Sequence, residues 1–296
     1  MRNILALDIG GTFIKYALAS EDGSLRGFGR VGVGSDYTNF IDGIKDIKNS
    51  FHEPVEGVAA ALCGGYDFKN RKIFAPNLTL LNGRDVVSDI EAALKVPVVV
   101  ENDANLAALG EYVACEKGNI DDMIFVTLGT GVGGGLIMGG KLPQLSVTGF
   151  EIGHICVCPE GRPCGCGREG CLDEYCSSGG LISAYKELHG EDKDITPEKL
   201  GLLAGQGDSK AIAAFEEYGK FLGRGLADAV NLFCPQKIKL GGGLSELAGY
   251  FLTECKKTFY DEVFPLYRDK VVIEIASLKN NAGMVGAAAY FFMNVN

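Results

Sequence analysis

The chain has 296 residues, of which 47% are hydrophobic, and a formal net charge of −10. This length accommodates two α/β domains with a cleft for a small ligand. The acidic balance argues against nucleic-acid binding, because a protein that holds phosphate backbones needs a basic face. No uncharged stretch is long enough to cross a membrane, and the N-terminal run reaches Asp8 before a secretory signal forms, so we expect a soluble cytoplasmic protein.

The first part of the chain predicts an α/β domain that opens with a three-strand antiparallel meander. Its strands are the segments 3–9, 13–19 and 24–31, which glycine-containing turns separate. A helix at about 37–51, a strand at 55–62, a helix at 83–96, a strand at 96–100 and a helix at 104–118 follow. The alternation of strands and helices is typical of an α/β layer.

A second unit of strand, glycine turn and strand occupies 123–142 and has the same layout as the first hairpin. This similarity predicts an internal duplication, with one copy in each domain. Helical periodicity follows at 179–190, 196–204 and 209–235, then a strand and helix start at 237–246, a strand at 271–278 and a last helix at 282–292. We expect one domain at 1–117 plus the C-terminal helix 282–296, and a larger one at 118–281.

Three glycine turns follow three strands: Gly10-Gly11-Thr12, the run from Gly129 to Gly135, and Gly241-Gly242-Gly243. Each is either a tight structural turn or backbone that approaches a bound nucleotide, and three of them in an acidic chain favour the second interpretation. None completes a P-loop or a dinucleotide-binding fingerprint. The positive potential for a phosphate would then come from backbone N–H groups, helix N-termini and Mg²⁺.

Two aspartates follow predicted strands. Asp8 ends the first strand, where a carboxylate either holds Mg²⁺ through water or forms an Asx-type turn. Asp103 follows Glu101 and Asn102 at the carboxyl end of a buried strand, where α/β sheets present ligand-binding groups. Asp103 is either the N-cap of the next helix or a general base that accepts a proton from a substrate hydroxyl.

The segment 151–174, "EIGHICVCPEGRPCGCGREGCLDE", contains five of the ten cysteines. One histidine and three thiols within it make a closed tetrahedral set suited to structural Zn²⁺: His154, Cys164, Cys166 and Cys171. Free reduced thiols are the alternative. A closed set leaves no position for a reactive water, which disfavours a zinc hydrolase. Cys156 and Cys158 are competing ligands, and their strand-like alternation predicts that at least one faces a core. The four scattered cysteines are expected to be buried apolar residues: Cys63, Cys115, Cys234 and Cys255.

Taken together, "DIGGT", "ENDAN", "LGTGVGGG", "EIGH" followed by C-x-C-G-x-x-G-C, and "LGGG" resemble the motifs of the ROK family, in the family's order from Leu5 to Ala289. This family contains bacterial sugar kinases for glucose, fructose, allose and N-acetylmannosamine, and sugar-responsive repressors. The resemblance implies a two-domain actin-like, hexokinase-like ATPase fold that closes over ATP and sugar. Family repressors carry an N-terminal helix-turn-helix extension, whereas this chain opens at the first strand, so we expect no DNA binding.

The resemblance also implies roles for single residues. ATP would contact the glycine turns, with its phosphates at the first two and its adenosine near the third: Gly10, Gly11, Thr12, Gly129, Thr130, Gly131, Gly133, Gly134, Gly241 and Gly242, with Asp8 on the Mg²⁺ side. Asp103 would be the base. The sugar would be contacted by Asn102, Asp103, Glu151, His154, Asp173 and Gly64, and His154 would also ligate structural Zn²⁺.

The chain departs from the family pattern at two positions. Asp173 stands where the family has a sugar-contacting glutamate, so either its shorter carboxylate or that of Glu174 takes the role. Cys63-Gly64 replaces a Pro-Gly pair, which leaves the support of that loop to be explained. The expected function is ATP-dependent phosphorylation of a hexose, glucose-like and at O6. The alternatives are a kinase for another hexose or amino sugar and a catalytically silent sugar-binding regulator. By analogy with the family, a homodimer or homotetramer is expected.

Overall fold

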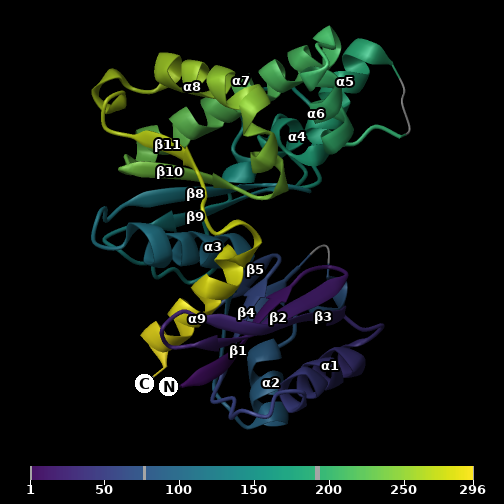
Figure 1. Cartoon of the computed structure of the whole chain (residues 1–296), viewed down its shortest axis with the longest axis vertical. Helices are drawn as coiled ribbons and strands as arrows, with labels where there is room; N and C mark the ends of the chain where they lie inside the picture. Colours follow the sequence, from purple (N-terminus) through teal and green to yellow (C-terminus); the bar gives the residue numbers. More distant parts are fainter. Residues whose placement is uncertain (1, 76–77, 191–193, 296) are drawn as a thin grey trace. The chain divides into compact units, whose positions relative to one another are not determined.

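A computed structural model describes residues 2–75, 78–190 and 194–295 of the chain (Figure 1). It divides into two compact units. The first consists of Met1–Asp121, Gly135–Gly149 and Leu278–Asn296, and the second of Asp122–Gly134 and Phe150–Ser277. The segment 135–149, which the sequence-based division assigned to the second domain, groups with the first unit. Among the described residues, no helix combines the length and apolar character needed to cross a bilayer.

The first unit is built on a five-stranded sheet. The predicted antiparallel meander is present as β1 (Asn3–Ile9), β2 (Phe13–Ser20) and β3 (Leu25–Gly32). The strands β4 (Val58–Leu62) and β7 (Val98–Asn102) run parallel to β1, which gives the order β3-β2-β1-β4-β7. The carboxyl ends of β1, β4 and β7 therefore meet at one edge. Asp8 is the last but one residue of β1, and Cys63 and Asp103 directly follow β4 and β7.

Helices cover both faces of this sheet, because successive side chains of β1 point to opposite sides. Leu5, Leu7 and Ile9 pack into one core with α1 (Tyr37–Asn49) and α2 (Val86–Leu94). Ile4 and Ala6 pack into a second core with α3 (Asp103–Glu111) and the C-terminal α9 (Ala282–Asn294). Figure 1 shows α1 and α2 on one side of the sheet and α9 on the other.

Three local features of the first unit were not predicted. The helix expected at 104–118 changes after Glu111 into a π-helical turn, η2 (Tyr112–Glu116). A small antiparallel hairpin, β5 (Gly65–Asp67) and β6 (Lys72–Phe74), follows β4, and a short 3-10 turn, η1 (Thr79–Leu81), precedes α2.

The second sheet has the order β11-β10-β8-β9, made of β8 (Met123–Leu128), β9 (Val132–Ile137), β10 (Lys237–Gly241) and β11 (Val272–Ile275). Both neighbours of β10 run parallel to it. Read from the opposite edge, this order matches β2-β1-β4-β7 of the first sheet, which agrees with the duplication expected from the two glycine hairpins.

The helices of the second unit follow the predicted order, except that the first and shortest of them was not predicted. They are α4 (Asp173–Cys176), α5 (Ser178–His189), α6 (Pro197–Gly205), α7 (Ser209–Phe233) and α8 (Ala248–Glu262). Short 3-10 turns lie at η3 (Ile152–His154), η4 (Gly243–Leu247), η5 (Pro265–Tyr267) and η6 (Lys279–Asn281), the last belonging to the first unit. On α7, Phe215, Leu222 and Leu226 are buried as their spacing predicts, whereas Ile212, expected to share the apolar face, is 38% exposed. This helix ends at Phe233, two residues before Pro235, because proline cannot continue it.

Candidate active site and metal centre

The start of α3 is held by a small polar cluster at the end of β7. Asn102, not Asp103, is the N-cap: its Oδ1 accepts hydrogen bonds from the N–H groups of Ala104 and Asn105 at 2.9 and 3.1 Å. Its Nδ2 donates to the carbonyl of Gly64 at 3.0 Å. The capping alternative for Asp103 is therefore wrong, and this residue is the first of the helix.

The buried Glu101 supports the same helix start. Its Oε1 accepts from the N–H of Asn102 at 2.8 Å and from Nδ2 of Asn105 at 3.0 Å. Burial raises the pKa of Glu101, and the two hydrogen bonds oppose that rise. Glu101 thus fixes the backbone on which Asp103 is mounted.

The first glycine turn is closed by its own backbone. Gly10 N–H donates to the carbonyl of Phe13 at 3.1 Å. Asp8, just before the turn, lies opposite Lys15 in the β1–β2 pair, and its Oδ2 accepts from Lys15 Nζ at 3.1 Å. Asp8 thus makes a cross-strand ion pair rather than an Asx turn, and any Mg²⁺ on this carboxylate would compete with Lys15.

The thiol of Cys63 lies in the same environment as these two aspartates. Burial raises its pKa to about 11, and the charges of Asp103 and Asp8 act in the same direction. Cys63 is therefore a neutral thiol near neutral pH. Like the proline that the family has at this position, Cys63 therefore places no charge beside the two aspartates.

Gly64 is a position where only glycine fits. Its φ is +119°, and a Cβ atom there would collide with the carbonyl oxygen of Phe74. The backbone at Gly64 thus packs directly on β6. This close approach sets the carbonyl of Gly64 where Asn102 binds it.

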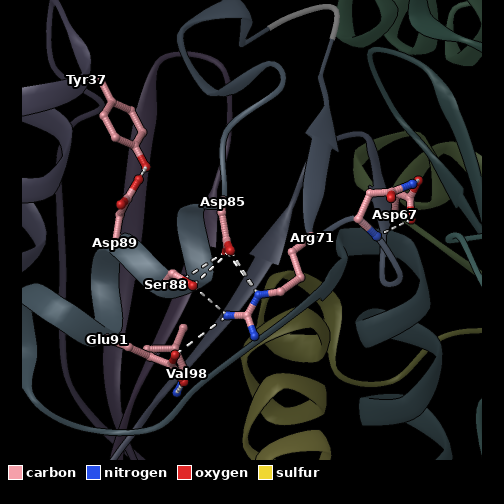
Figure 2. A network of polar contacts seen from close by, with 9 residues as sticks. Tyr37, Asp67, Arg71, Asp85, Ser88, Asp89, Glu91 and Val98 are labelled. Carbon is pink, nitrogen blue, oxygen red and sulfur yellow. Dashed lines mark hydrogen bonds and ion pairs between the residues drawn. The ribbon is translucent and has the colours of Figure 1, made fainter.

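An ion-pair network anchors the hairpin that supports Gly64 (Figure 2). Arg71, in the β5–β6 turn, donates through Nε to both oxygens of Asp85 at 3.2 and 3.0 Å and through Nη2 to Ser88 Oγ at 3.0 Å. Glu91 lies 3.6 Å from the same Nη2. Asp85 also caps α2 through Ser88 N–H, so the network fixes the hairpin to the N-terminus of that helix.

The other strand of the hairpin is held by Thr148. Tyr66 N–H donates to Thr148 Oγ1, and Thr148 N–H donates to the carbonyl of Tyr66, both at 3.0 Å. Together with the Arg71 network, this contact supplies the support for the Cys63-Gly64 loop without a proline in it.

In the second unit the glycine turn at 129–134 is held by side chains as well as by backbone. Gly129 N–H donates to the carbonyl of Gly131 at 3.0 Å within the turn. Asp173 Oδ1 accepts from Val132 N–H at 2.5 Å, and Ser178 donates to the carbonyl of Gly129. The "EIGH" motif lies against the same turn, because a Cβ atom on Gly153 would collide with the carbonyl oxygen of Val132.

The other predicted residues of this unit surround that turn. Glu151 is exposed and precedes η3, and its carbonyl accepts from His154 N–H at 3.0 Å. The turn at Gly241 and Gly242 packs on the end of β8, where the space next to Gly242 is filled by the backbone of Leu128. The second unit therefore brings together the second and third glycine turns, "EIGH" and Asp173.

The expected metal ligands converge. The ligand atoms of His154, Cys164, Cys166 and Cys171 all lie within 4.8 Å of one another. Cys166 Sγ lies 3.6 Å from Cys171 Sγ, and Cys164 Sγ lies 3.7 Å from His154 Nδ1. Tetrahedral Zn²⁺ with bonds of about 2.3 Å to sulfur places its thiolates about 3.8 Å apart, so these side chains fit that ion.

Metal binding would require the thiols of this cluster to lose their protons. Burial raises the pKa of the Cys164 thiol to about 12, so a bound dication is needed to hold it as a thiolate near neutral pH. The ring nitrogen of His154 that lies 3.7 Å from Cys164 Sγ is Nδ1. Its Nε2 therefore remains at the opposite edge of the ring.

The loop that carries the thiols is tied together by backbone contacts. Cys164 N–H donates to the carbonyl of Arg168 at 2.8 Å, and Arg168 Nη1 donates to the carbonyl of His154 at 3.1 Å. Arg162 lies over the ring of Tyr175 and donates to the carbonyl of Glu174 at 2.9 Å. These contacts link the segment 154–171, which we call the metal loop, to α4.

The remaining cysteines correct two expectations. Cys156 is exposed and Cys158 is half-buried, whereas Val157 between them is buried, so the expectation that one of the two thiols faces a core is wrong. Among the four scattered cysteines only Cys255 is buried, and the others are half-buried. A short alternating segment does not show which of its two sets of side chains points into the protein.

Comparison with known proteins shows which family the chain resembles along its length. The family model described as "ROK family" matches residues 4–293. The glucokinase of Streptomyces coelicolor is 33% identical over 304 residues, which cover 96% of each chain. The N-acetylmannosamine kinase of Shigella flexneri is 32% identical over 296 residues, covering 96% of this chain and 97% of that one.

A solved structure agrees with these relatives. A ROK family glucokinase from Streptomyces griseus, in complex with glucose and AMPPNP, has a TM-score of 0.82 and 33% identity, covering 97% of this chain and 98% of that chain. The two open sheets and their helices are thus those of the actin-like ATPase fold expected from the motifs. Because the family match spans residues 4–293 and the matches to sugar kinases cover at least 96% of both chains, this chain belongs to the ROK family and is a sugar kinase.

Proposed function

We propose that this chain transfers the γ-phosphoryl group of ATP to O6 of a glucose-like hexose. The observation that carries the proposal is the placement of Asp103. It is the first residue of α3, on a helix start that Asn102 caps and Glu101 supports. A carboxylate on a fixed helix start is suited to accept a proton from one hydroxyl of a bound sugar.

In the first unit, the sugar would meet Asn102, Asp103 and Gly64. Asn102 Oδ1 is occupied by α3, and one N–H of its amide is bound to Gly64. The amide carries a second N–H, which is available to a sugar hydroxyl. Since Asn102 is held at both ends, it positions that donor without a further loss of side-chain freedom.

In the second unit, the sugar contacts would come from Glu151 and His154. Zn²⁺ on Nδ1 of His154 would fix the plane of the ring and leave Nε2 for a sugar hydroxyl. The exposed carboxylate of Glu151 lies three residues before this ring and is an acceptor for hydroxyl groups.

The nucleotide would be held mainly by backbone. In a chain with a net charge of −10, the N–H groups of the turns at Gly10–Thr12 and Gly129–Gly134 supply the donors for its phosphates, and Gly241 and Gly242 would lie near adenosine. Mg²⁺, on the side of Asp8, would neutralise charge on the transferring group. Asp103 takes the hydroxyl proton as the sugar oxygen attacks the γ-phosphorus, and ADP leaves.

The test is ADP release from ATP over a panel of glucose, mannose, fructose, allose, N-acetylglucosamine and N-acetylmannosamine, followed by NMR of the phosphorylated product. We expect the highest kcat/KM with glucose and phosphate on O6. Preference for N-acetylmannosamine would shift the assignment to the other group of relatives. Binding of a sugar without any ADP release would instead indicate a catalytically silent regulator.

The role of Asp103 has its own variant. In Asp103→Asn we expect kcat to fall by about 10²- to 10⁴-fold, because the general base is lost, while sugar affinity stays within about threefold. The matched control is Asp42→Asn on the exposed side of α1, which should leave both quantities unchanged. A variant Asp103→Asn that turns over at nearly the wild-type rate would contradict the assignment.

A further inference from the structure

The segment that follows the last metal ligand holds the second glycine turn at both ends. At one end, Ser178 N–H and Ser178 Oγ donate to the carbonyl of Gly129 at 2.7 and 2.9 Å. At the other, Asp173 Oδ1 accepts from Val132 N–H. Asp173 begins α4 and Ser178 begins α5, so two helix starts fix a turn more than 40 residues earlier in the chain.

Asp173 also lies close to the glycine that precedes Val132. A Cβ atom on Gly131 would lie 3.1 Å from Asp173 Oδ1, so the carboxylate lies directly against this glycine. A glutamate at position 173 carries its carboxylate one methylene further from the backbone. It therefore cannot occupy the same place without moving the turn, and the departure from the family pattern is coupled to this contact.

The hydrogen bonds also decide which donors of the turn remain for a ligand. Gly129 N–H is bound within the turn and Val132 N–H is bound to Asp173. Within the described ranges, the N–H groups of Thr130 and Gly131 have no protein acceptor. These two successive N–H groups lie between Gly129 and Val132, which are both held by hydrogen bonds. They form the part of the turn that a phosphate oxygen can reach.

We propose that Asp173 and Ser178 are positioning residues for the phosphate-binding turn, and that Asp173 acts on nucleotide binding rather than as a sugar contact. This inference rests on the proposed function, in which the turn at 129–134 receives the phosphates of ATP. One oxygen of Asp173 is already bound to the turn. Leu172 N–H also donates to the carbonyl of Ile155 at 2.9 Å. This bond ties the start of α4, and with it Asp173, to the loop that carries the thiols.

A charge argument separates this role from sugar binding. The carboxylate of Asp173 stabilises the turn but also places a negative charge beside bound phosphates. Asparagine retains an acceptor oxygen for Val132 N–H and removes that charge. Asp173→Asn should therefore bind nucleotide as tightly as the wild type or more tightly, whereas Asp173→Ala loses the acceptor.

The experiment measures binding of MgAMPPNP and of the preferred sugar separately by calorimetry, so that neither needs turnover. In Asp173→Ala we expect the nucleotide Kd to rise by about 10- to 100-fold, the range for losing a hydrogen bond to a charged group. Asp173→Asn should stay within about threefold of the wild type or bind more tightly. Ser178→Ala should weaken nucleotide binding by about two- to fivefold, since its backbone N–H still binds Gly129. Sugar Kd should stay within about threefold in all three variants.

The remaining variants and controls fix the interpretation. Asp173→Glu should raise the KM for ATP and lower kcat, because its longer side chain displaces the turn. Glu216→Gln, on the exposed side of α7, should change nothing. If Asp173→Ala does not fold, the KM for ATP of Asp173→Glu and the nucleotide Kd of Ser178→Ala still decide the question.

Two results would overturn the proposal. The first is a sugar Kd at least tenfold weaker in Asp173→Asn with an unchanged nucleotide Kd, which would make Asp173 a sugar ligand. The second is a nucleotide Kd in Asp173→Ala equal to that of the wild type. A wild-type protein that binds no MgAMPPNP would instead show that the proposed nucleotide site is wrong, and with it the positioning role of Asp173 and Ser178. A wild type that binds nucleotide but phosphorylates no sugar refutes only the proposed kinase reaction.

Discussion

The two units support their candidate site residues by different means. In the first unit, the loop at Gly64 depends on a hairpin that Arg71 and Thr148 hold by hydrogen bonds and exposed ion pairs. In the second, the loop from Glu151 to Asp173 depends on four side chains arranged for one metal ion. The first support is divided among many weak contacts, and the second is concentrated at one point.

The magnitudes of these supports differ widely. An exposed ion pair contributes about 0–1 kcal/mol, whereas a structural Zn²⁺ site contributes on the order of 10 kcal/mol to the segment that it organises. The candidate site residues on the loop from Glu151 to Asp173 should therefore lose their positions abruptly when one ligand is lost. Those that depend on the hairpin should instead be affected gradually as single contacts are removed.

Loss of a metal ligand gives the largest expected effect. In Cys166→Ser we expect the zinc content to fall from about one per chain to near zero. Sugar affinity should fall by at least about 100-fold, because Glu151 and His154 lose their fixed positions. Metal analysis and calorimetry of the purified reduced protein measure both quantities.

The matched control is Cys156→Ser, an exposed thiol in the same segment that lies outside the ligand set. Its zinc content and sugar affinity should equal those of the wild type. Wild-type protein that contains no zinc would refute the metal centre. Equal loss of zinc in both variants would mean that the ligand set is drawn differently from the one that the structure brings together.

A substitution at Gly64 tests the point where the hairpin meets the site. Gly64→Ala should destabilise the protein by about 1–3 kcal/mol, because its φ is +119° and the new Cβ atom meets the carbonyl of Phe74. Sugar affinity should fall along with stability, since the carbonyl of Gly64 shifts away from Asn102. Denaturant unfolding and sugar calorimetry provide the two readouts.

Gly83→Ala separates strain from collision. Gly83 also has a positive φ, +72°, but no other atom lies within 4 Å of the place that a Cβ atom would take there. We expect about 1 kcal/mol of destabilisation at this position and unchanged sugar affinity. If the two variants behave alike, the close approach of Gly64 to β6 has no role in the site.

Much of the fold was predictable because its signals are local and periodic. The strand at 3–9, the helix at 209–233 and the glycine turns between paired strands each follow from spacing within a short window. The hairpin at 65–74 was missed because its strands have three residues each, too few for an alternation to appear. The π-helical turn at 112–116 has no sequence signal that distinguishes it from the helix that it extends.

The candidate site divides in the same way. The metal ligands were predictable because residue type and spacing alone identify them, and the structure brings all four together. The capping alternative for Asp103 placed the N-cap one residue too late, because Asn and Asp are both good caps and only the backbone shows where α3 begins. The bond between Asp173 and Val132 could not be predicted, since it joins positions 41 residues apart whose proximity depends on the packing of α4 against the turn.

The smallest expected effect is at Arg71, and pH is the way to resolve it. Arg71→Met should lower stability by about 1 kcal/mol at pH 7, because it removes contacts to Asp85, Ser88 and Glu91 that are partly exposed to solvent. Burial alone would raise the pKa of Asp85, but the hydrogen bonds from Ser88 and the ion pair with Arg71 outweigh it and lower this pKa below its ordinary value of 3.8.

Since the folded pKa of Asp85 lies below the unfolded one, its contribution to stability is present above the unfolded pKa and is lost as the pH falls through the folded pKa. The difference in unfolding free energy between wild type and Arg71→Met should therefore be constant from about pH 7 to pH 5 and shrink below about pH 4. The control Lys45→Met, which removes the exposed pair with Asp42 on α1, should show no measurable difference at any pH. If Arg71→Met lowered the sugar affinity as much as Cys166→Ser does, the hairpin, like the loop from Glu151 to Asp173, would be held at a single point.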